Sequence, residues 1–429
     1  MIISDIALRK TDDFAEFSAN ISPETWRAGK KRRDFRIWFR VRGADLNTPL
    51  WGDVFLVSLL PACMFSNERL HVEAPVSRRL LETLPKIQKT YRAWFAGFNT
   101  IPVTCTETHG PLPPSTDLGT ATLFSGGVDS WYTLLKHRPE ITHLLLIRGF
   151  DVKNDDDVLW EKATGCVMRA AESFGKTAVF IETNLKKRAD ISHKNCAWGK
   201  PFPGFFWSTC LGGALSAVSL CLQGVVSKSF IPSSYQQDEL FPHGTHPDLD
   251  PLWSTDDIEI IHDGTEKDRI EKIRAQLVQS SVALQNIRVC WQNIPNVLNC
   301  CRCEKCIRTM LTLKICGVLE QSTAFHQPFT ASKIRRILIR PSNEDLYRRM
   351  MQEARAMGDS KIADAIAVAL GDKFSLSHIW ALVHQCIGEN LIKRAPSRWV
   401  PWIRWAFGPV LKHAEVPHGI IEEEKETAS

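Results

Sequence analysis

"TLFSGGVDSWYTLL", residues 122–135, predicts a strand, a tight glycine loop and the start of a helix. Two consecutive glycines allow the backbone to approach a ligand closely, because no side chain stands in the way. Backbone N–H groups in such a loop, with the partial positive charge of a helix N-terminus, commonly bind phosphate. Ser125 and Ser130 add hydroxyl donors, and Asp129 stands where a carboxylate caps the helix or holds Mg²⁺. The stretch therefore predicts a phosphate site.

The chain after Thr120 alternates short apolar runs with helical stretches, which predicts an α/β fold with a parallel sheet covered on both faces. In such a sheet ligands bind beyond the carboxyl ends of the strands, where the glycine loop lies. The loop lacks the Gly-Lys-Ser/Thr ending of the Walker motif and the G-x-G-x-x-G spacing of dinucleotide-binding proteins. The predicted strands are 120–124, 142–149, 176–183 and 224–232, and the predicted helices are 129–138, 156–174 and 205–222.

We expect three domains along the chain. Residues 1–115 mix predicted strands and helices and end in a linker rich in Pro, Gly, Ser and Thr, so we expect an N-terminal α+β domain. Residues 116–320 form the α/β domain, and residues 321–429 form a helical extension. Its last part, 394–413, holds three tryptophans among arginines, and packing against the protein is favoured over binding to a membrane surface or nucleic acid.

Composition places the chain among soluble globular proteins. The 429 residues are 44% hydrophobic and 24% charged, and the net charge of +5 suits a phosphate-bearing ligand without being a nucleic-acid signature. No signal peptide is evident, so the thirteen cysteines predict reduced thiols in a cytoplasmic protein. Polar residues interrupt the longest apolar run, 205–226, which favours a buried helix over a membrane span.

A cysteine cluster predicts a metal site. The pattern C-x₉-C-x₂-C-x₂-C brings four thiolates into range of one tetrahedral ion, as in structural Zn²⁺ sites, although an iron–sulfur cluster also uses four cysteines. Cys301 is then the spare thiol. The predicted ligands are Cys290, Cys300, Cys303 and Cys306.

These two motifs resemble a known family. "SGGVDS" after a strand matches the SGGxDS signature of the PP-loop ATP pyrophosphatases, which have an adenine-nucleotide α-hydrolase-like core. The cysteine cluster narrows the resemblance to the 7-cyano-7-deazaguanine synthases, whose zinc motif is C-x₈-C-G-x-C-x-x-C. Here the first spacer is one residue longer, and Cys301 replaces the usual Gly. The resemblance covers roughly residues 118–320.

The resemblance implies roles for individual residues. The segment "HDGTEKDRIEKI", residues 262–273, is similar to the family's basic-x-Glu helix, and a surface helix with a Lys267–Glu271 charge pair is the alternative. Zinc would be held by the four cysteines. Catalytic roles would fall to Asp129, Arg269 and Glu271, and Mg·ATP would be bound by Ser125, Gly126, Gly127, Asp129, Ser130 and Lys267, with Lys272 nearby.

The implied activity is that of an AMP-forming carbon–nitrogen ligase. It would adenylate a carboxylate of the deazaguanine type, release pyrophosphate and form an amide or nitrile. The acceptor stays open, because "RGFDVKNDDD" (148–157) replaces the family's Tyr-Gly-Gln segment. In the loop 235–254 we expect the His and Asp residues to shape a substrate pocket or cap a turn rather than bind a second metal; these are His243, His246, Asp248 and Asp250.

The flanking extensions resemble those of larger synthase-like proteins from anti-phage defence systems of the Qat and type IV CBASS kinds. That likeness implies a protein acceptor or a partner in a defence complex. Three alternatives stay open: a tRNA-modifying enzyme, a sulfur-transfer enzyme using Cys210 or Cys301, and a non-catalytic nucleotide-binding scaffold.

Overall fold

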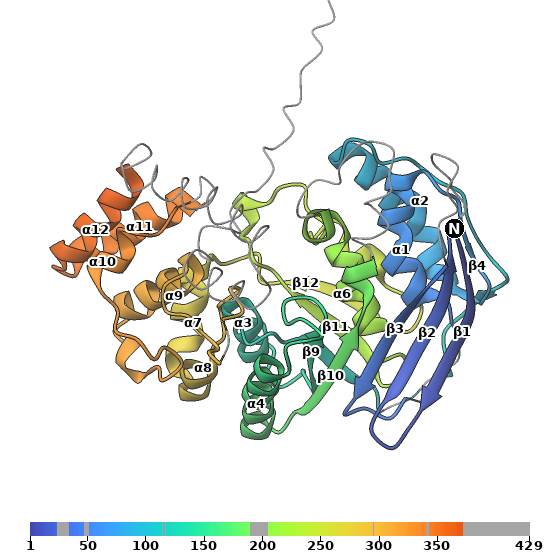
Figure 1. Cartoon of the computed structure of the whole chain (residues 1–429), viewed down its shortest axis with the longest axis horizontal. Helices are drawn as coiled ribbons and strands as arrows, with labels where there is room; N and C mark the ends of the chain where they lie inside the picture. Colours follow the sequence, from blue (N-terminus) through green and yellow to red (C-terminus); the bar gives the residue numbers. More distant parts are fainter. Residues whose placement is uncertain are drawn as a thin grey trace, which may run out of the picture.

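The protein is built on one ten-stranded mixed sheet with helices on both faces (Figure 1). The strand order is β12-β11-β8-β9-β10-β3-β2-β1-β4-β6, and β5 and β7 form a separate pair. The computed structural model describes residues 1–23, 34–46, 51–113, 115, 117–188, 205–294, 296–339 and 343–371.

The strands of the large sheet are β1 (Ile2–Lys10), β2 (Ala15–Ser22), β3 (Phe35–Arg42), β4 (Leu70–Val72), β6 (Val103–Cys105), β8 (Gly119–Leu123), β9 (His143–Arg148), β10 (Thr177–Thr183), β11 (Val226–Pro232) and β12 (Glu259–Asp263). The small pair is β5 (Val76–Ser77) and β7 (Thr108–His109). The helices are α1 (Asp53–Ser66), α2 (Arg78–Trp94), α3 (Val128–Lys136), α4 (Asp157–Phe174), α6 (Leu211–Leu220), α7 (Arg269–Ala275), α8 (Ser281–Asn286), α9 (Glu304–Ile315), α10 (Ala331–Ile334), α11 (Glu344–Ala356) and α12 (Ser360–Gly371).

The predicted parallel sheet is confirmed. Strands β12, β11, β8, β9 and β10 run parallel to one another, and the predicted helices lie between them in the chain. The sheet then continues into the first 50 residues, because β3 pairs antiparallel with β10 and places Arg40 opposite Glu182. β3 thus covers an edge that would otherwise leave the N–H and C=O groups of β10 unpaired.

Side-chain capping sets the ends of the helices around the sheet. The Asp156 side chain accepts the Leu159 N–H at the start of α4, and α4 ends at Gly175 with φ +63°. The Ser77 hydroxyl caps α2 in the same way. These caps satisfy N–H groups that have no partner inside the helix.

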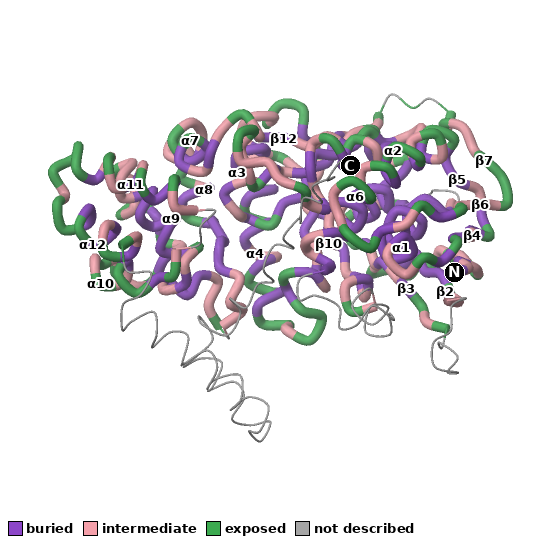
Figure 2. Tube along the Cα trace, turned by 90° about the horizontal axis from the view of Figure 1, so that it is seen from above, coloured by how far each residue is buried: buried purple, intermediate pink, exposed green. Residues whose placement is uncertain are grey.

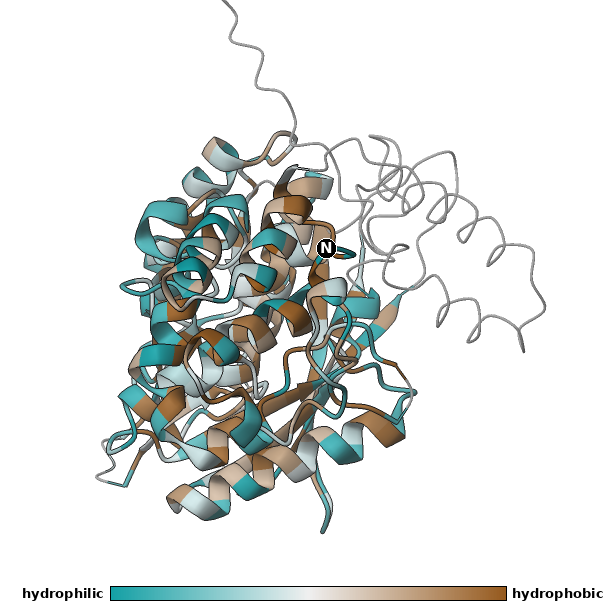
Figure 3. Ribbon diagram, turned by 90° about the vertical axis from the view of Figure 1, so that its left-hand side faces the viewer, coloured by the Kyte–Doolittle hydropathy of each residue, from teal (hydrophilic) through white to brown (hydrophobic). Residues whose placement is uncertain are grey.

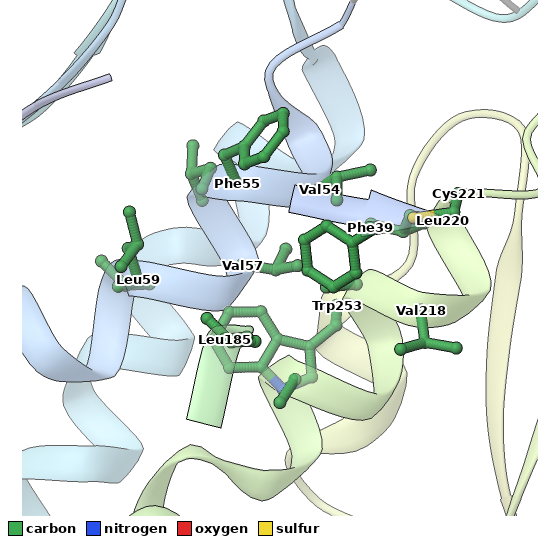
Figure 4. Packing of buried hydrophobic residues seen from close by; sticks show 14 of the residues in the cluster. Phe39, Val54, Phe55, Val57, Leu59, Leu185, Val218, Leu220, Cys221 and Trp253 are labelled. Atoms are coloured by element: carbon green, nitrogen blue, oxygen red, sulfur yellow. The ribbon is translucent and has the colours of Figure 1, made fainter. Parts of the chain in front are cut away.

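Hydrophobic cores lie on both faces of the sheet. On one face, α1 and α6 pack against each other and against the N-terminal strands, with Phe39, Val57 and Val218 around the fully buried Trp253 (Figure 4). On the other face, α3, α4, α7 and α9 enclose the second core. Hydrophobic residues gather in the sheet and on the inner sides of the helices (Figure 3). Both cores bury the apolar surface that stabilises the fold.

The long apolar run is confirmed as interior. It forms a five-residue π-helical turn, Phe206–Cys210, followed by α6, whose residues are mostly buried. No helix among the described residues is long and apolar enough to cross a membrane.

The described part of the C-terminal extension is helical, as predicted. Leu346, Met350 and Ala354 form the buried stripe of α11, whereas Met357, just beyond the helix, is 54% exposed. The helices α10, α11 and α12 lie together at one end of the molecule (Figure 2). The tryptophan-rich segment 394–413 lies outside the described residues.

Candidate functional site

The glycine loop connects the end of β8 to the start of α3. Gly126 has φ +78°, a left-handed conformation that costs little for glycine alone. Its carbonyl accepts the Arg288 N–H at 2.7 Å, and the Gly127 N–H donates to the Ser125 hydroxyl at 3.3 Å. The N-cap residue of α3 is Gly127, and no side chain caps this helix end. The backbone N–H groups in the first turn of α3 are therefore not capped by a side chain, which leaves them available to a ligand at the loop.

Asp129 is held by two cations from α7. Its carboxylate lies 2.9 Å from the Arg269 guanidinium and 3.2 Å from the Lys272 ammonium, which also donates to the Ser233 carbonyl at 2.6 Å. Burial raises the pKa of Asp129, but Arg269 and Lys272 outweigh it, so the net shift of this pKa is downward. Asp129 is consequently ionised at neutral pH.

The other α7 residues separate into different roles. Asp268 and Glu271 form a capping box, in which each carboxylate accepts the other residue's backbone N–H, at 2.8 and 3.0 Å. The Glu271 side chain thus turns back onto its own helix. Lys267 is half-buried, and neither the loop nor Glu271 shares a hydrogen bond or ion pair with it among the described residues. Lys272 takes the place next to the loop.

Two further cations come from α9 and were missed by the sequence analysis. Lys305 is an exposed residue that interacts electrostatically with Arg269 and Asp129. Arg308 is buried; its Nε lies 3.4 Å from Glu304 without hydrogen-bond geometry. Lys305 and Arg308 are three residues apart, so they lie on one face of the helix, and this spacing could have indicated them from the sequence.

Another buried arginine has its backbone beside the loop. Arg288 is 6% exposed, and a Cβ at Gly126 would lie 3.5 Å from its Cβ. The Nε of Arg288, like that of Arg308, finds no hydrogen-bond acceptor in the described structure. A buried donor without an acceptor is costly, so the Nε of Arg308, whose side chain interacts electrostatically with Asp129, points to an anionic ligand at this place.

The four predicted cysteines come together as predicted. Their Sγ atoms all lie within 4.8 Å of one another, and all four residues are buried. Zn–S bonds of about 2.3 Å in a tetrahedron separate the sulfurs by about 3.8 Å, close to the 3.9 Å between Cys300 and Cys306. Hydrogen bonds from neighbouring thiols, that of Cys290 above all, hold the pKa of Cys300 far below its usual range. The group could hold a metal ion such as Zn²⁺.

Asn299 joins the two segments that carry these thiols. Its Oδ1 accepts the N–H groups of Val289 and Cys290, at 2.9 and 3.2 Å. Its Nδ2 donates to the carbonyls of Ile287 and Ala324, at 2.8 and 3.1 Å. Asn299 is 1% exposed, so each of these bonds satisfies a group that water cannot reach.

The spare thiol is closed off from the surface. Cys301 is fully buried and has φ +55°, the conformation that favours glycine. Burial raises the pKa of its thiol, although backbone hydrogen bonds from Gln327 and His326 oppose this shift. Cys210 is also buried, at 1% exposure. Buried thiols of this kind are poor nucleophiles, which weighs against the sulfur-transfer alternative.

Residues of the loop 235–254, which is rich in His and Asp, form hydrogen bonds with one another. The His246 ring accepts the Asp248 N–H at 3.0 Å, and the Asp250 carboxylate lies 2.6 Å from the Thr245 hydroxyl and 2.8 Å from His262. His262, at the end of β12, had not been singled out from the sequence. Within the described part of the chain, the four cysteines form the one His/Cys/Asp/Glu group compact enough for a metal. These contacts agree with turn capping rather than a second metal site.

Comparisons with models of protein families, with curated proteins and with solved structures found no match.

Proposed function

We propose that the glycine loop binds the pyrophosphate of ATP and that the protein is an AMP-forming ligase with a PP-loop core, similar to 7-cyano-7-deazaguanine synthase. The carrying observation is a helix end without a side-chain cap, next to the left-handed Gly126 and near the buried Arg308, whose Nε lacks an acceptor. Such a site needs an anion of high charge. The loop lies past the carboxyl end of β8, where ligands bind in parallel α/β sheets.

Each residue of the site has its own role in the proposed reaction. Arg269, Lys272 and Lys305 neutralise the phosphates, and the α3 amides orient them. Asp129 is the carboxylate that would hold Mg²⁺, since hard cations prefer oxygen ligands. Bound Mg²⁺ supplies further charge neutralisation on the phosphates. Glu271 contributes by fixing the start of α7 through its capping box, and this places Arg269.

The reaction follows from this arrangement. A carboxylate oxygen of the acceptor attacks the α-phosphorus, the bond to the β-phosphate breaks, and pyrophosphate leaves. An amine then attacks the acyl carbon of the adenylate, a C–N bond forms, and AMP leaves with a proton lost from nitrogen. The product is an amide, and a second activation of that amide would give a nitrile. In a defence setting the amine belongs to a protein.

The test is the identity of the nucleotide product. Purified protein is incubated with labelled Mg·ATP and 7-carboxy-7-deazaguanine, with ammonia or a protein amine. We expect AMP and pyrophosphate, lost in Lys272→Met and retained in the matched variant Lys228→Met, whose lysine pairs with Glu140 instead. ADP as product would overturn the proposal. ATP binding without turnover on any acceptor would support the scaffold alternative.

A further inference from the structure

We infer that the four-thiol group positions the phosphate-binding residues, so that metal binding and nucleotide binding strengthen each other. This inference rests on the proposed nucleotide site. Two connections lead from the thiols to the glycine loop. One runs through the segment that precedes Cys290, and the other runs through α9, whose Lys305 and Arg308 interact electrostatically with Asp129. A metal site that stabilised only residues 290–306 would not require either connection to the glycine loop.

The first connection is a backbone one. The Arg288 N–H donates to the Gly126 carbonyl at 2.7 Å, and Arg288 stands two residues before Cys290. The Cys290 N–H is in turn fixed by Asn299, the neighbour of Cys300. The position of Gly126 is therefore tied to two of the four thiols by hydrogen bonds and short stretches of chain. A shift of Cys290 reaches the loop after two residues.

The second connection is the start of α9. Cys303 is the N-cap residue of this helix, its carbonyl accepts the Ile307 N–H at 2.9 Å, and its own N–H donates to the Cys300 sulfur at 3.2 Å. Lys305 lies between Cys303 and Cys306, and Arg308 lies two residues beyond Cys306. The thiols thus fix both ends of the first turn of α9, which carries Lys305, and Arg308 follows directly in the next turn.

Metal binding holds this turn in one place. Without an ion, thiolates this close repel one another, and thiols lack the bonds that fix their spacing. Loss of the ion then frees α9 and the 288–290 segment together. Because coupling between two sites is reciprocal, the factor by which metal tightens nucleotide binding equals the factor by which nucleotide tightens metal binding.

The experiment measures both factors on the full chain. Zinc affinity is determined by competition with a fluorescent chelator, with and without a non-hydrolysable ATP analogue and excess Mg²⁺. Affinity for the analogue is determined by calorimetry on zinc-loaded and stripped protein. We expect each affinity to rise at least fivefold when the other ligand is bound, by the same factor within error.

Lys305→Gln separates the inference from simple unfolding, because it leaves all four thiols in place. We expect this variant to bind zinc like wild type without nucleotide and to lose most of the tightening by nucleotide. The variant is also the control for zinc that the analogue binds directly, because this effect is the same for wild type and Lys305→Gln. Unchanged zinc affinity at a concentration of analogue that saturates the protein would overturn the inference and leave the proposed function standing. No binding of the analogue to zinc-loaded protein would overturn both.

Discussion

Replacing Asn299 by Ala tests how much the joint between the two thiol-bearing segments stabilises the fold. The substitution removes four hydrogen bonds with donor–acceptor distances between 2.8 and 3.2 Å. It leaves two N–H and two C=O groups without this partner at a place that is 1% exposed. At about 1 kcal/mol for each bond, we expect the free energy of unfolding to fall by about 4 kcal/mol. Zinc affinity should fall as well, since Cys290 loses its fixed position.

The assay is urea-induced unfolding followed by tryptophan fluorescence, with Asn20→Ala as the matched control. Asn20 is exposed, and among the described residues its side chain makes one hydrogen bond, to Asp5 at 2.8 Å, so this variant should change stability by about 0.5 kcal/mol or less. A loss below about 1 kcal/mol in Asn299→Ala would refute the reasoning, because water would then be satisfying groups that the structure closes off.

The remaining predictions concern the loop, the core and pH. Gly126→Val should cost about 1–2 kcal/mol of stability from φ +78° alone, and it should abolish binding of an ATP analogue measured by calorimetry. Trp253→Ala should lower stability by about 3–5 kcal/mol in urea unfolding, whereas Trp253→Phe should cost less. His109 lies 2.9 Å from the buried Asp53. Burial lowers its pKa, but the hydrogen bonds to Asp53 and to the Gly110 carbonyl, together with the negative charges of Asp53 and Asp257, outweigh burial and raise the pKa above the ordinary value. The pair therefore stabilises fully below about pH 6.5, and the stability difference between wild type and His109→Gln should shrink as pH rises from 6 to 9. A difference that grows with pH would contradict this assignment.

The strands and helices of residues 118–232 could be predicted from the sequence because each depends on a local pattern. Alternating apolar runs and helical stretches set β8 to β11, and the glycine loop fell between a strand and a helix. The pairing of β3 with β10 was not predicted. Alternation of apolar residues shows that a strand has a buried face, and it carries no information about which strand lies beside it.

In the candidate site, too, local patterns could be predicted and contacts between distant segments could not. The cysteine spacing predicted the four-thiol group, since short spacers already restrict how far apart the sulfurs can lie. Lys305 and Arg308 were missed because they reach the loop through the packing of α9, which no motif encodes. Glu271 was expected at the site, but its carboxylate finds a nearer partner in the Asp268 N–H. The Glu271 carboxylate therefore caps its own helix and does not extend to the glycine loop.

Exchange of labelled pyrophosphate into ATP tests the central claim most directly, because it reports cleavage between the α- and β-phosphates without needing the amine. With 7-carboxy-7-deazaguanine or another carboxylate acceptor, we expect acceptor-dependent label in ATP for wild type and none for Asp129→Ala. If wild-type protein binds ATP but no carboxylate acceptor brings label into ATP, the assignment of the glycine loop to adenylation is contradicted.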